Sequence, residues 1–199
     1  MTPKRANLTE EFERLLDEHL DSAERARALL APAAALAEAA ISVLRAGGKL
    51  LLCGNGGSAA DSQHIATELT VRFERDRQAL PAISLTTDSS ALTAAGNDLG
   101  FDQIFARQVA ALGRKGDLLI GLTTSGNSSN VIAALKSARS QGIATACLTG
   151  REGGAIAKGG LADHCLIVPS DNTARIQELH IFIGHLLCAA IDAAFVGKD

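Results

Sequence analysis

The sequence predicts an α/β fold in which a parallel sheet of five strands is covered by helices on both faces. Short apolar runs, typical of fully buried strands, alternate along the chain with longer stretches whose apolar residues recur at helical spacing. Strands that alternate with helices are joined by crossover connections, which make a sheet parallel and cover both of its faces. The expected class is therefore a doubly wound, flavodoxin-like sheet, preceded by an N-terminal helical pair.

The chain is expected to open with two helices. The first follows Asn7, which has the capping-box spacing with the glutamate three residues later, and its apolar residues between Leu8 and Leu20 recur at helical intervals. The second begins at Pro32, because proline suits the first turn of a helix, and ends at the glycines 47–48.

The alternation of strands and helices begins after this pair. Strands are predicted at 49–53, 81–86, 117–122, 143–148 and 164–168. Helices are predicted at 58–72, 101–112, 130–141 and 173–195. Because no linker, repeat or low-complexity tract divides the chain, we expect residues 47–199 to form one domain and residues 1–46 to belong to it.

Composition excludes several classes of function. The 199 residues include 36 alanines and 19 glycines but no tryptophan or tyrosine, so aromatic platforms for single-stranded nucleic acid are missing. A net charge of -3 gives no general attraction to nucleic acid or to an anionic membrane. The four cysteines show no CxxC spacing, and the charged N-terminus is unlike a signal peptide. We therefore expect a cytoplasmic protein with reduced thiols, no nucleic-acid partner and no membrane partner.

Two predicted strands end in loops suited to phosphate, since ligands of open α/β sheets bind where strand ends meet helix amino termini. The first loop, GNGGS at 54–58, is neither a dinucleotide fingerprint nor a Walker motif, and alone it fits a turn as well as a site. The second loop, TTSGNS at 123–128, carries four hydroxyls where a helix cap needs one. Together the loops predict a phosphorylated small molecule as ligand.

Polar side chains on two predicted helices could form a reacting centre. His64 and Glu68 are four residues apart and share a helix face, while Gln177 and His185 lie eight apart on the last helix. Nitrogen and oxygen donors of this kind suit zinc. Spacing alone leaves open whether His185 is a ligand or a hydrogen-bonded core histidine.

Five motifs resemble the sugar isomerase (SIS) domain family and, within it, the phosphoheptose isomerases. They are GNGGSAAD at 54–61, QHIATEL at 63–69, ALTAAGND at 91–98, TTSGNSSNV at 123–131 and ARIQELHIFIGH at 174–185. The resemblance covers residues 45–195 and implies the SIS fold. It implies an isomerase that converts D-sedoheptulose 7-phosphate to D-glycero-D-manno-heptose 7-phosphate through an enediol. This is the first step toward ADP- or GDP-heptose for the lipopolysaccharide core or other glycans. It also implies a homotetramer with one Zn²⁺ per subunit.

The resemblance also implies roles for individual residues. The zinc ligands would be His64, Glu68, Gln177 and His185, with Glu68 as the base and His185 as its acid partner. A carboxylate held tightly by zinc is a poor base, so the two roles of Glu68 conflict unless it loosens during turnover. The substrate-binding positions would be Asn55, Gly56, Gly57, Ser58, Glu68, Asn97, Asp98, Thr123, Thr124, Ser125, Ser128 and Gln177.

The sequence leaves open the roles of two arginines and two alternative functions. Arg72 and Arg175 could pair with phosphate or with carboxylates across a subunit boundary, but a solvated arginine is the favoured interpretation for each. The SIS fold also serves as a non-catalytic regulator that associates with the replication initiator, and other SIS enzymes act on other sugar phosphates. A pure binder has no chemical need for Glu68 and His185, which favours the enzyme.

Overall fold

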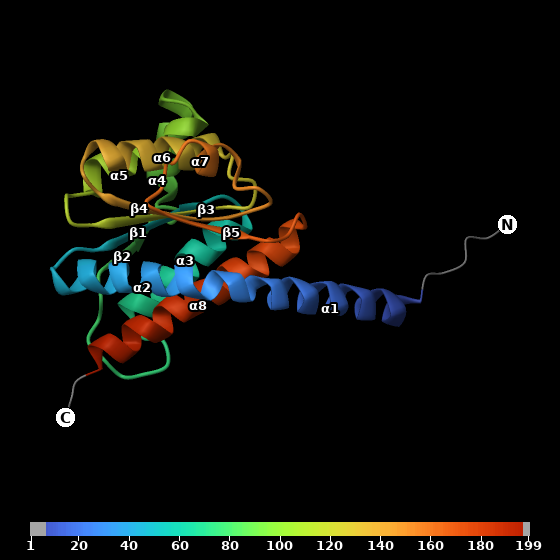
Figure 1. The fold of residues 1–199 in the computed structure, drawn as a ribbon. Helices are drawn as coiled ribbons and strands as arrows, with labels where there is room; N and C mark the ends of the chain where they lie inside the picture. Colours follow the sequence, from blue (N-terminus) through green and yellow to red (C-terminus); the bar gives the residue numbers. More distant parts are fainter. Residues whose placement is uncertain (1–6, 197–199) are drawn as a thin grey trace.

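A computed structural model describes residues 7–196 and contains one five-stranded sheet (Figure 1). Its strands are β1 (Leu50–Gly54), β2 (Ala82–Ser84), β3 (Leu118–Thr123), β4 (Ala144–Gly150) and β5 (His164–Val168). Their order across the sheet is β2-β1-β3-β4-β5, and every neighbouring pair is parallel. The predicted doubly wound sheet with flavodoxin-like order is confirmed.

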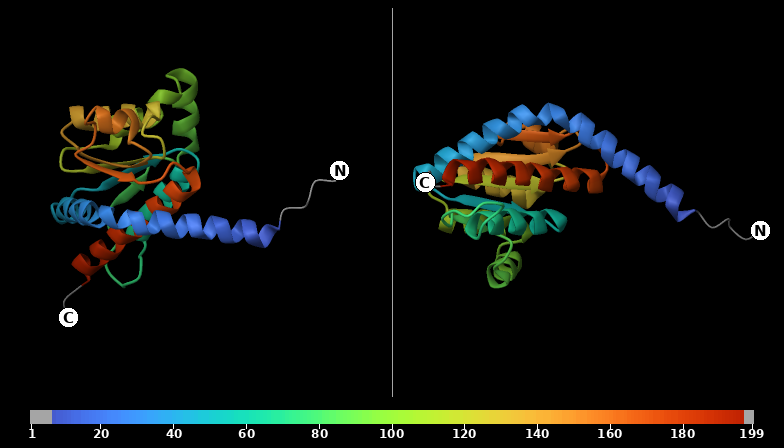
Figure 2. Two further views of the ribbon diagram at one scale, coloured as in Figure 1. Left: turned by 45° about the vertical axis from the view of Figure 1, so that its right-hand side comes forward. Right: turned by 90° about the horizontal axis from the view of Figure 1, so that it is seen from below.

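Helices cover both faces of the sheet (Figures 1 and 2). One layer contains α2 (Leu30–Arg45), α3 (Gly57–Thr70) and α8 (Thr173–Phe195), and the other contains α4 (Ser89–Asp98), α5 (Ala106–Leu112), α6 (Ser129–Ser140) and α7 (Gly154–Lys158). Alternate strand residues pack against opposite helix layers. Leu50 and Leu52 belong to the core under α2, α3 and α8, whereas Leu51 and Cys53 belong to the opposite core. The strands are buried on both faces, which explains their continuous apolar runs.

The predicted N-terminal pair is a single bent helical segment. α1 (Leu8–Arg25) passes through a 3₁₀ turn (Ala26–Leu29) directly into α2, because no glycine interrupts the chain there and Pro32 is tolerated in the first turn of α2. The predicted cap is present: the Asn7 side chain accepts a hydrogen bond from the Thr9 N–H at 3.1 Å and donates one to Glu10 at 3.0 Å. α1 projects away from the body of the molecule (Figure 2).

Two short helices escaped the sequence analysis. α4 is rich in serine, threonine, glycine and asparagine, and α7 has only five residues, the first of them a glycine, so neither shows a clear helical repeat. The predicted helix over 101–112 is divided into a 3₁₀ turn (Phe101–Gln103) and α5.

Two helical segments, Leu8–Arg45 and α8, are long and apolar enough to cross a membrane by length and composition alone. In α8 much of this hydropathy belongs to core residues: Leu179, Ile183 and Leu187 are buried between the sheet and its neighbouring helices. A buried core helix passes the same test of length and composition as a membrane span.

A largely buried ion pair lies at the amino edge of the sheet, where β1 and β3 begin. The Lys49 ammonium lies 2.5 Å from the Asp117 carboxylate, which also accepts the N–H groups of Lys49 at 3.0 Å and Arg114 at 2.8 Å. Burial acts to raise the pKa of Asp117, but these hydrogen bonds and the Lys49 charge outweigh it and hold that pKa below its ordinary value.

Asp117→Asn should lower the free energy of unfolding at pH 7 by about 2 kcal/mol, because charge-assisted hydrogen bonds are lost. A carboxylate with a lowered folded-state pKa stabilises the fold above its unfolded pKa, roughly 3.9, and loses that contribution as pH falls through the folded value. Urea denaturation of both proteins at pH 7 and pH 3 should therefore show the difference shrinking at the acid pH. An equal difference at both values would contradict this account.

Candidate active site

The candidate site lies at the carboxyl edge of the sheet, where the chain turns in opposite directions from two adjacent strands. β1 leads toward β2 and β3 leads toward β4, which makes the gap between their loops the expected ligand crevice of a doubly wound sheet. The side-chain amides of Asn55 and Asn130 donate to each other's oxygens at 2.9 and 2.8 Å and tie the two loops together. Sequence analysis missed the buried Asn130, although an asparagine in the first turn after the hydroxyl loop was a usable signal.

The loop 123–128 presents hydroxyls around the amino end of α6. The hydroxyls of Thr123 and Ser128 lie 2.8 Å apart, and Ser125 Oγ accepts the N–H of Asn127 at 3.1 Å. Gly126 has a φ of +65°, and a Cβ there would lie 2.0 Å from the Gly153 oxygen, so only glycine fits this turn. Hydroxyls and helix N–H groups in this arrangement can surround a phosphate without a cationic side chain.

The loop 54–58 meets a cleft of about 470 Å³ beside α4. The cleft is lined by Asn55 and Gly56 from the loop and by Thr93 and Gly96 from α4. Gly57 and Ser58 begin α3, and Ser58 is buried. The amino end of α3 and the amino end of α6 therefore both face the crevice between β1 and β3.

Three predicted ligands from two helices come together further along α3. His64 Nε2 lies 3.0 Å from Glu68 Oε1 and 3.2 Å from His185 Nε2, and the candidate ligand atoms of all three residues lie within 4.8 Å of one another. The Phe73 ring stacks on the His185 ring at a centroid distance of 5.4 Å. Two imidazoles and a carboxylate at such distances form a donor set that a metal ion can occupy.

The fourth predicted ligand, Gln177, reaches the amino end of α3. A Cβ on Gly57 would lie 2.6 Å from the Gln177 Nε2 atom, so the amide of Gln177 covers this glycine. Gln177 thus lies beside the loop 54–58, while His64 lies two turns further along α3.

Asn97 and Asp98 stand apart from these groups. Both are exposed at the end of α4, where the Asn97 amide donates to the Asp98 carboxylate at 2.7 Å. Asp98 lines a hollow between α4 and α5 together with Asp88 and Arg107. The structure does not bring these two residues to the His64 cluster, and their role in substrate binding stays a prediction.

The two arginines, Arg72 and Arg175, differ in exposure. Arg72 is exposed as expected, but the solvated interpretation is wrong for Arg175, whose side chain is 11% exposed. Arg175 donates to the Leu15 carbonyl of α1 and to Glu178, both at 2.7 Å. It holds α1 against α8 because its guanidinium finds acceptors on both helices.

Asp61 is a candidate site residue that sequence analysis missed. It lies one turn before His64, and one of its carboxylate oxygens is buried without a hydrogen-bond partner among the described residues. Burial raises the pKa of Asp61 to about 6, and the nearby His64 opposes this shift. The sequence feature that could have revealed Asp61 is its place three residues before the predicted ligand His64. A carboxyl group that titrates near neutral pH can hold a proton beside His64.

His180, for which the sequence indicates no role, is a core residue. Its Nε2 lies 3.2 Å from the Thr149 carbonyl oxygen, and burial lowers its pKa to about 4, against the effect of this hydrogen bond. The ring is therefore neutral at physiological pH.

Comparisons with known proteins identify the family of the chain. The family model of the SIS domain matches residues 11–150. The phosphoheptose isomerase of Roseiflexus sp. (strain RS-1) is 57% identical over 161 residues, 79% of each chain. That of Solidesulfovibrio magneticus is 52% identical over 190 residues, 93% of this chain and 92% of the relative. The solved structure of phosphoheptose isomerase from Neisseria gonorrhoeae superposes with a TM-score of 0.88 at 47% identity, covering 94% of this chain and 100% of that one.

The fold and these matches place the chain in the SIS domain family, confirming the resemblance of the motifs. Within that family the chain belongs to the phosphoheptose isomerases.

Asp61→Asn should stabilise the metal-free protein at pH 7.5 by about 1 kcal/mol, allowing for solvent screening. A carboxyl group with a raised folded-state pKa favours the folded state at low pH, and this contribution is lost as pH rises through about 6. Urea denaturation of chelator-treated protein should show the gain at pH 7.5 and a smaller one at pH 4.5. The exposed Asp76→Asn is the control. An Asp61→Asn protein less stable than wild type at pH 7.5 would refute the assignment.

Proposed function

We propose that the chain converts D-sedoheptulose 7-phosphate to D-glycero-D-manno-heptose 7-phosphate, an aldose–ketose isomerisation in heptose biosynthesis. Two observations carry this proposal: Glu68 and His185 meet from two different helices, and a hydroxyl-rich loop lies at the carboxyl edge of the sheet. The relatives named phosphoheptose isomerase support the same substrate. We also propose that the product is used to make the heptose of the lipopolysaccharide core or of another glycan.

The reaction moves one hydrogen between neighbouring carbons. Thr123, Thr124, Ser125 and Ser128, together with Ser58 at the start of α3, anchor the phosphate, and Glu68 and His185 act on the carbonyl end of the sugar. Glu68 removes a proton from C1 while His185 protonates the C2 oxygen, which gives the enediol. Glu68 then returns its proton to C2, and His185 takes the proton from the C1 hydroxyl as the aldehyde forms. Each side chain ends the cycle in its starting protonation state.

We further propose that the metal is Zn²⁺, one per subunit, held by His64, Glu68 and His185, with Gln177 as the fourth ligand once its amide leaves its place over Gly57. The two imidazole nitrogens 3.2 Å apart and the adjacent carboxylate support this choice, because zinc favours nitrogen and oxygen donors in catalytic sites. Bound zinc would polarise the substrate carbonyl and stabilise the enediolate. Glu68 then has to loosen from the metal to act as a base, and His185 can exchange a proton only through a ring nitrogen that the metal does not hold.

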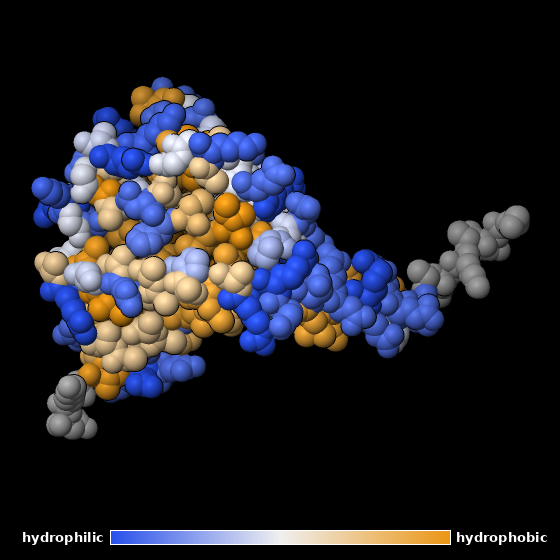
Figure 3. Space-filling model, viewed as in Figure 1, coloured by the Kyte–Doolittle hydropathy of each residue, from blue (hydrophilic) through white to orange (hydrophobic). Residues whose placement is uncertain are grey.

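We also propose a cytoplasmic homotetramer. α1 carries an apolar stripe at four-residue spacing, in which Leu8, Phe12, Leu16 and Leu20 are 65%, 63%, 57% and 56% exposed. Apolar side chains also appear on the underside of the projecting helix in Figure 3. An exposed stripe of this kind favours packing against further copies of the chain. Free cysteines support a reducing compartment.

Glu68→Gln should lower kcat for sedoheptulose 7-phosphate by about 10²- to 10⁴-fold, because the amide cannot accept the C1 proton. Product is followed by nuclear magnetic resonance, and zinc content is measured to separate loss of the base from loss of the metal. The exposed Glu38→Gln on α2 should keep the wild-type rate. Wild-type turnover by Glu68→Gln would exclude Glu68 as the base. Absence of aldose product from zinc-loaded wild-type protein would favour a non-catalytic regulator.

Removal of the metal should abolish turnover, because the carbonyl then lacks its polarising charge. Wild-type protein is dialysed against a chelator, assayed, and assayed again after one equivalent of Zn²⁺ per chain is returned. Recovery with Zn²⁺ but not with Mg²⁺ is expected, since imidazole donors disfavour Mg²⁺. Full activity of the zinc-free protein would contradict the proposed cofactor.

Sedimentation should give a mass near four times 20.6 kDa for the wild-type protein. Introducing charge into the stripe, as in Phe12→Glu with Leu16→Glu, should dissociate it, because buried unpaired carboxylates are costly. The matched control is Glu13→Gln with Asp17→Asn on the same helix, outside the stripe. A monomeric wild-type protein would refute the tetramer.

A further inference from the structure

A second buried ion pair lies at the far end of the contact between α3 and α8. Arg77, in the segment after α3, places its Nε 2.8 Å from Oδ1 of Asp192 near the end of α8. The two side chains are 0% and 2% exposed. Buried ion pairs contribute little to stability on balance, because desolvation of the charges offsets their attraction. The hydrogen bonds around the pair indicate a structural role beside its contribution to stability.

The guanidinium of Arg77 binds the carboxyl end of α3. Its Nη2 donates to the carbonyl oxygen of Glu68 at 2.6 Å, and its Nη1 donates to the carbonyl oxygen of Leu69 at 2.8 Å. Carbonyls in the last turn of a helix have no partner within the helix, and a cation there is also favoured by the helix dipole. Arg77 therefore fixes the backbone of the residue whose carboxylate belongs to the candidate site.

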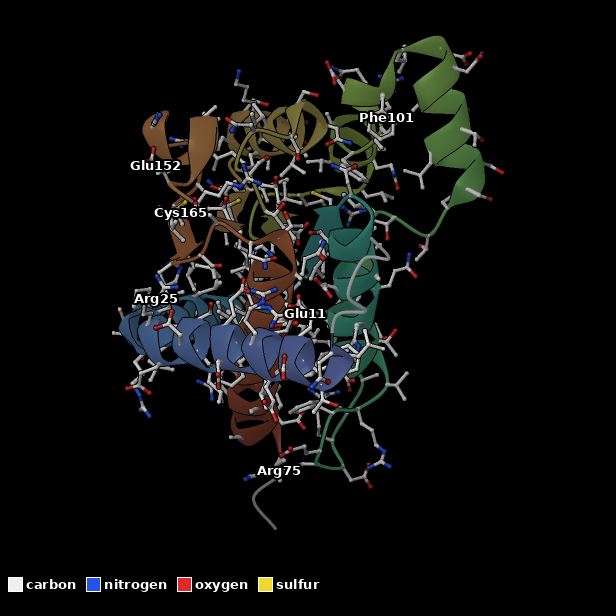
Figure 4. All side chains as sticks on the ribbon, turned by 90° about the vertical axis from the view of Figure 1, so that its right-hand side faces the viewer. Glu11, Arg25, Arg75, Phe101, Glu152 and Cys165 are labelled. Atoms are coloured by element: carbon white, nitrogen blue, oxygen red, sulfur yellow. The ribbon has the colours of Figure 1, made fainter. Side chains whose placement is uncertain are left out.

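Asp192 also accepts hydrogen bonds from the segment that follows α3. Its Oδ2 accepts the N–H groups of Glu74 and Arg75, each at 3.0 Å, so it holds the segment that follows α3 against α8. Figure 4 shows the labelled Arg75 on this segment, near the end of α8. Burial acts to raise the pKa of Asp192, but the hydrogen bonds and the Arg77 charge hold it below its ordinary value.

Helical spacing connects this pair with the site. Asp192 follows His185 by seven residues, or two turns, so both lie on the same face of α8. That face packs against α3, since His185 contacts His64 there. The pair therefore joins the backbone of Glu68 to the face of α8 that carries His185.

We propose that Arg77 is a positioning residue for the isomerase, acting through the α3 backbone to hold the Glu68 carboxylate at its place beside His185. This inference rests on the proposed function. Because Arg77 lies behind the site and not in the phosphate loop, its loss should affect kcat and metal affinity more than the KM for sugar phosphate.

The test compares the Arg77–Asp192 pair with the Lys49–Asp117 pair. Arg77→Lys retains the charge pair but loses the fork that reaches both carbonyls, and the double variant Arg77→Met, Asp192→Leu replaces the pair with apolar volume. The matched controls are Lys49→Arg and the double variant Lys49→Met, Asp117→Leu, in the ion pair that precedes β1 and β3. For each full-length protein we would measure the melting temperature, kcat, KM, and the Zn²⁺ dissociation constant by competition with a chromogenic chelator.

Both Arg77 variants should show kcat lowered and the Zn²⁺ dissociation constant raised by about tenfold or more, as expected when a group supporting a metal ligand is lost. The Lys49 controls should change the melting temperature and keep both values within about twofold of wild type. Arg77→Lys is decisive if the double variant does not fold, because it keeps the buried charges paired. Arg77→Lys with wild-type kcat and Zn²⁺ affinity would overturn the inference. An inactive wild-type protein would instead reject the proposed function, and the Zn²⁺ titrations would still decide whether Arg77 positions Glu68.

Discussion

The close approach of α3 and α8 is the constraint on which the candidate site depends. A Cβ on Gly184 would lie 2.6 Å from Cδ1 of Ile65, so glycine at 184 lets α8 pack on α3 without displacing the Ile65 side chain. At the amino end of α3, Gly57 leaves the same kind of space for Gln177. This contact brings the imidazoles of His64 and His185, 121 positions apart in the sequence, to 3.2 Å.

The sheet supplies the other half of the site. Because β1 and β3 are adjacent and parallel, their loops end side by side, and the paired amides of Asn55 and Asn130 fix the distance between them. The hydroxyl loop is therefore held by the strands, and the reacting groups are held by the helix contact. The proposed phosphate loop and the proposed reacting groups are thus positioned by separate rigid elements.

Much of the fold and part of the site followed from local sequence patterns. The five strands and the long helices were predictable because each buries a continuous apolar run or face, and His64 with Glu68 was predictable from spacing on one helix. α4 and α7 were not, because packing and not propensity maintains them. Arg77 resembles a solvated arginine in a charged segment, since its partner Asp192 lies 115 positions away. Asp61 was missed because its raised pKa arises from burial that sequence does not display.

In the proposed function, one contact between two helices builds a metal-dependent reacting centre. Anomalous diffraction from zinc-loaded crystals, recorded on both sides of the zinc absorption edge, tests this claim most directly. The account predicts one peak per chain, within coordination distance of His64, Glu68 and His185, about 2.0 to 2.2 Å from their donor atoms. A zinc peak bound elsewhere, or no peak between α3 and α8 in crystals that contain zinc, would contradict it.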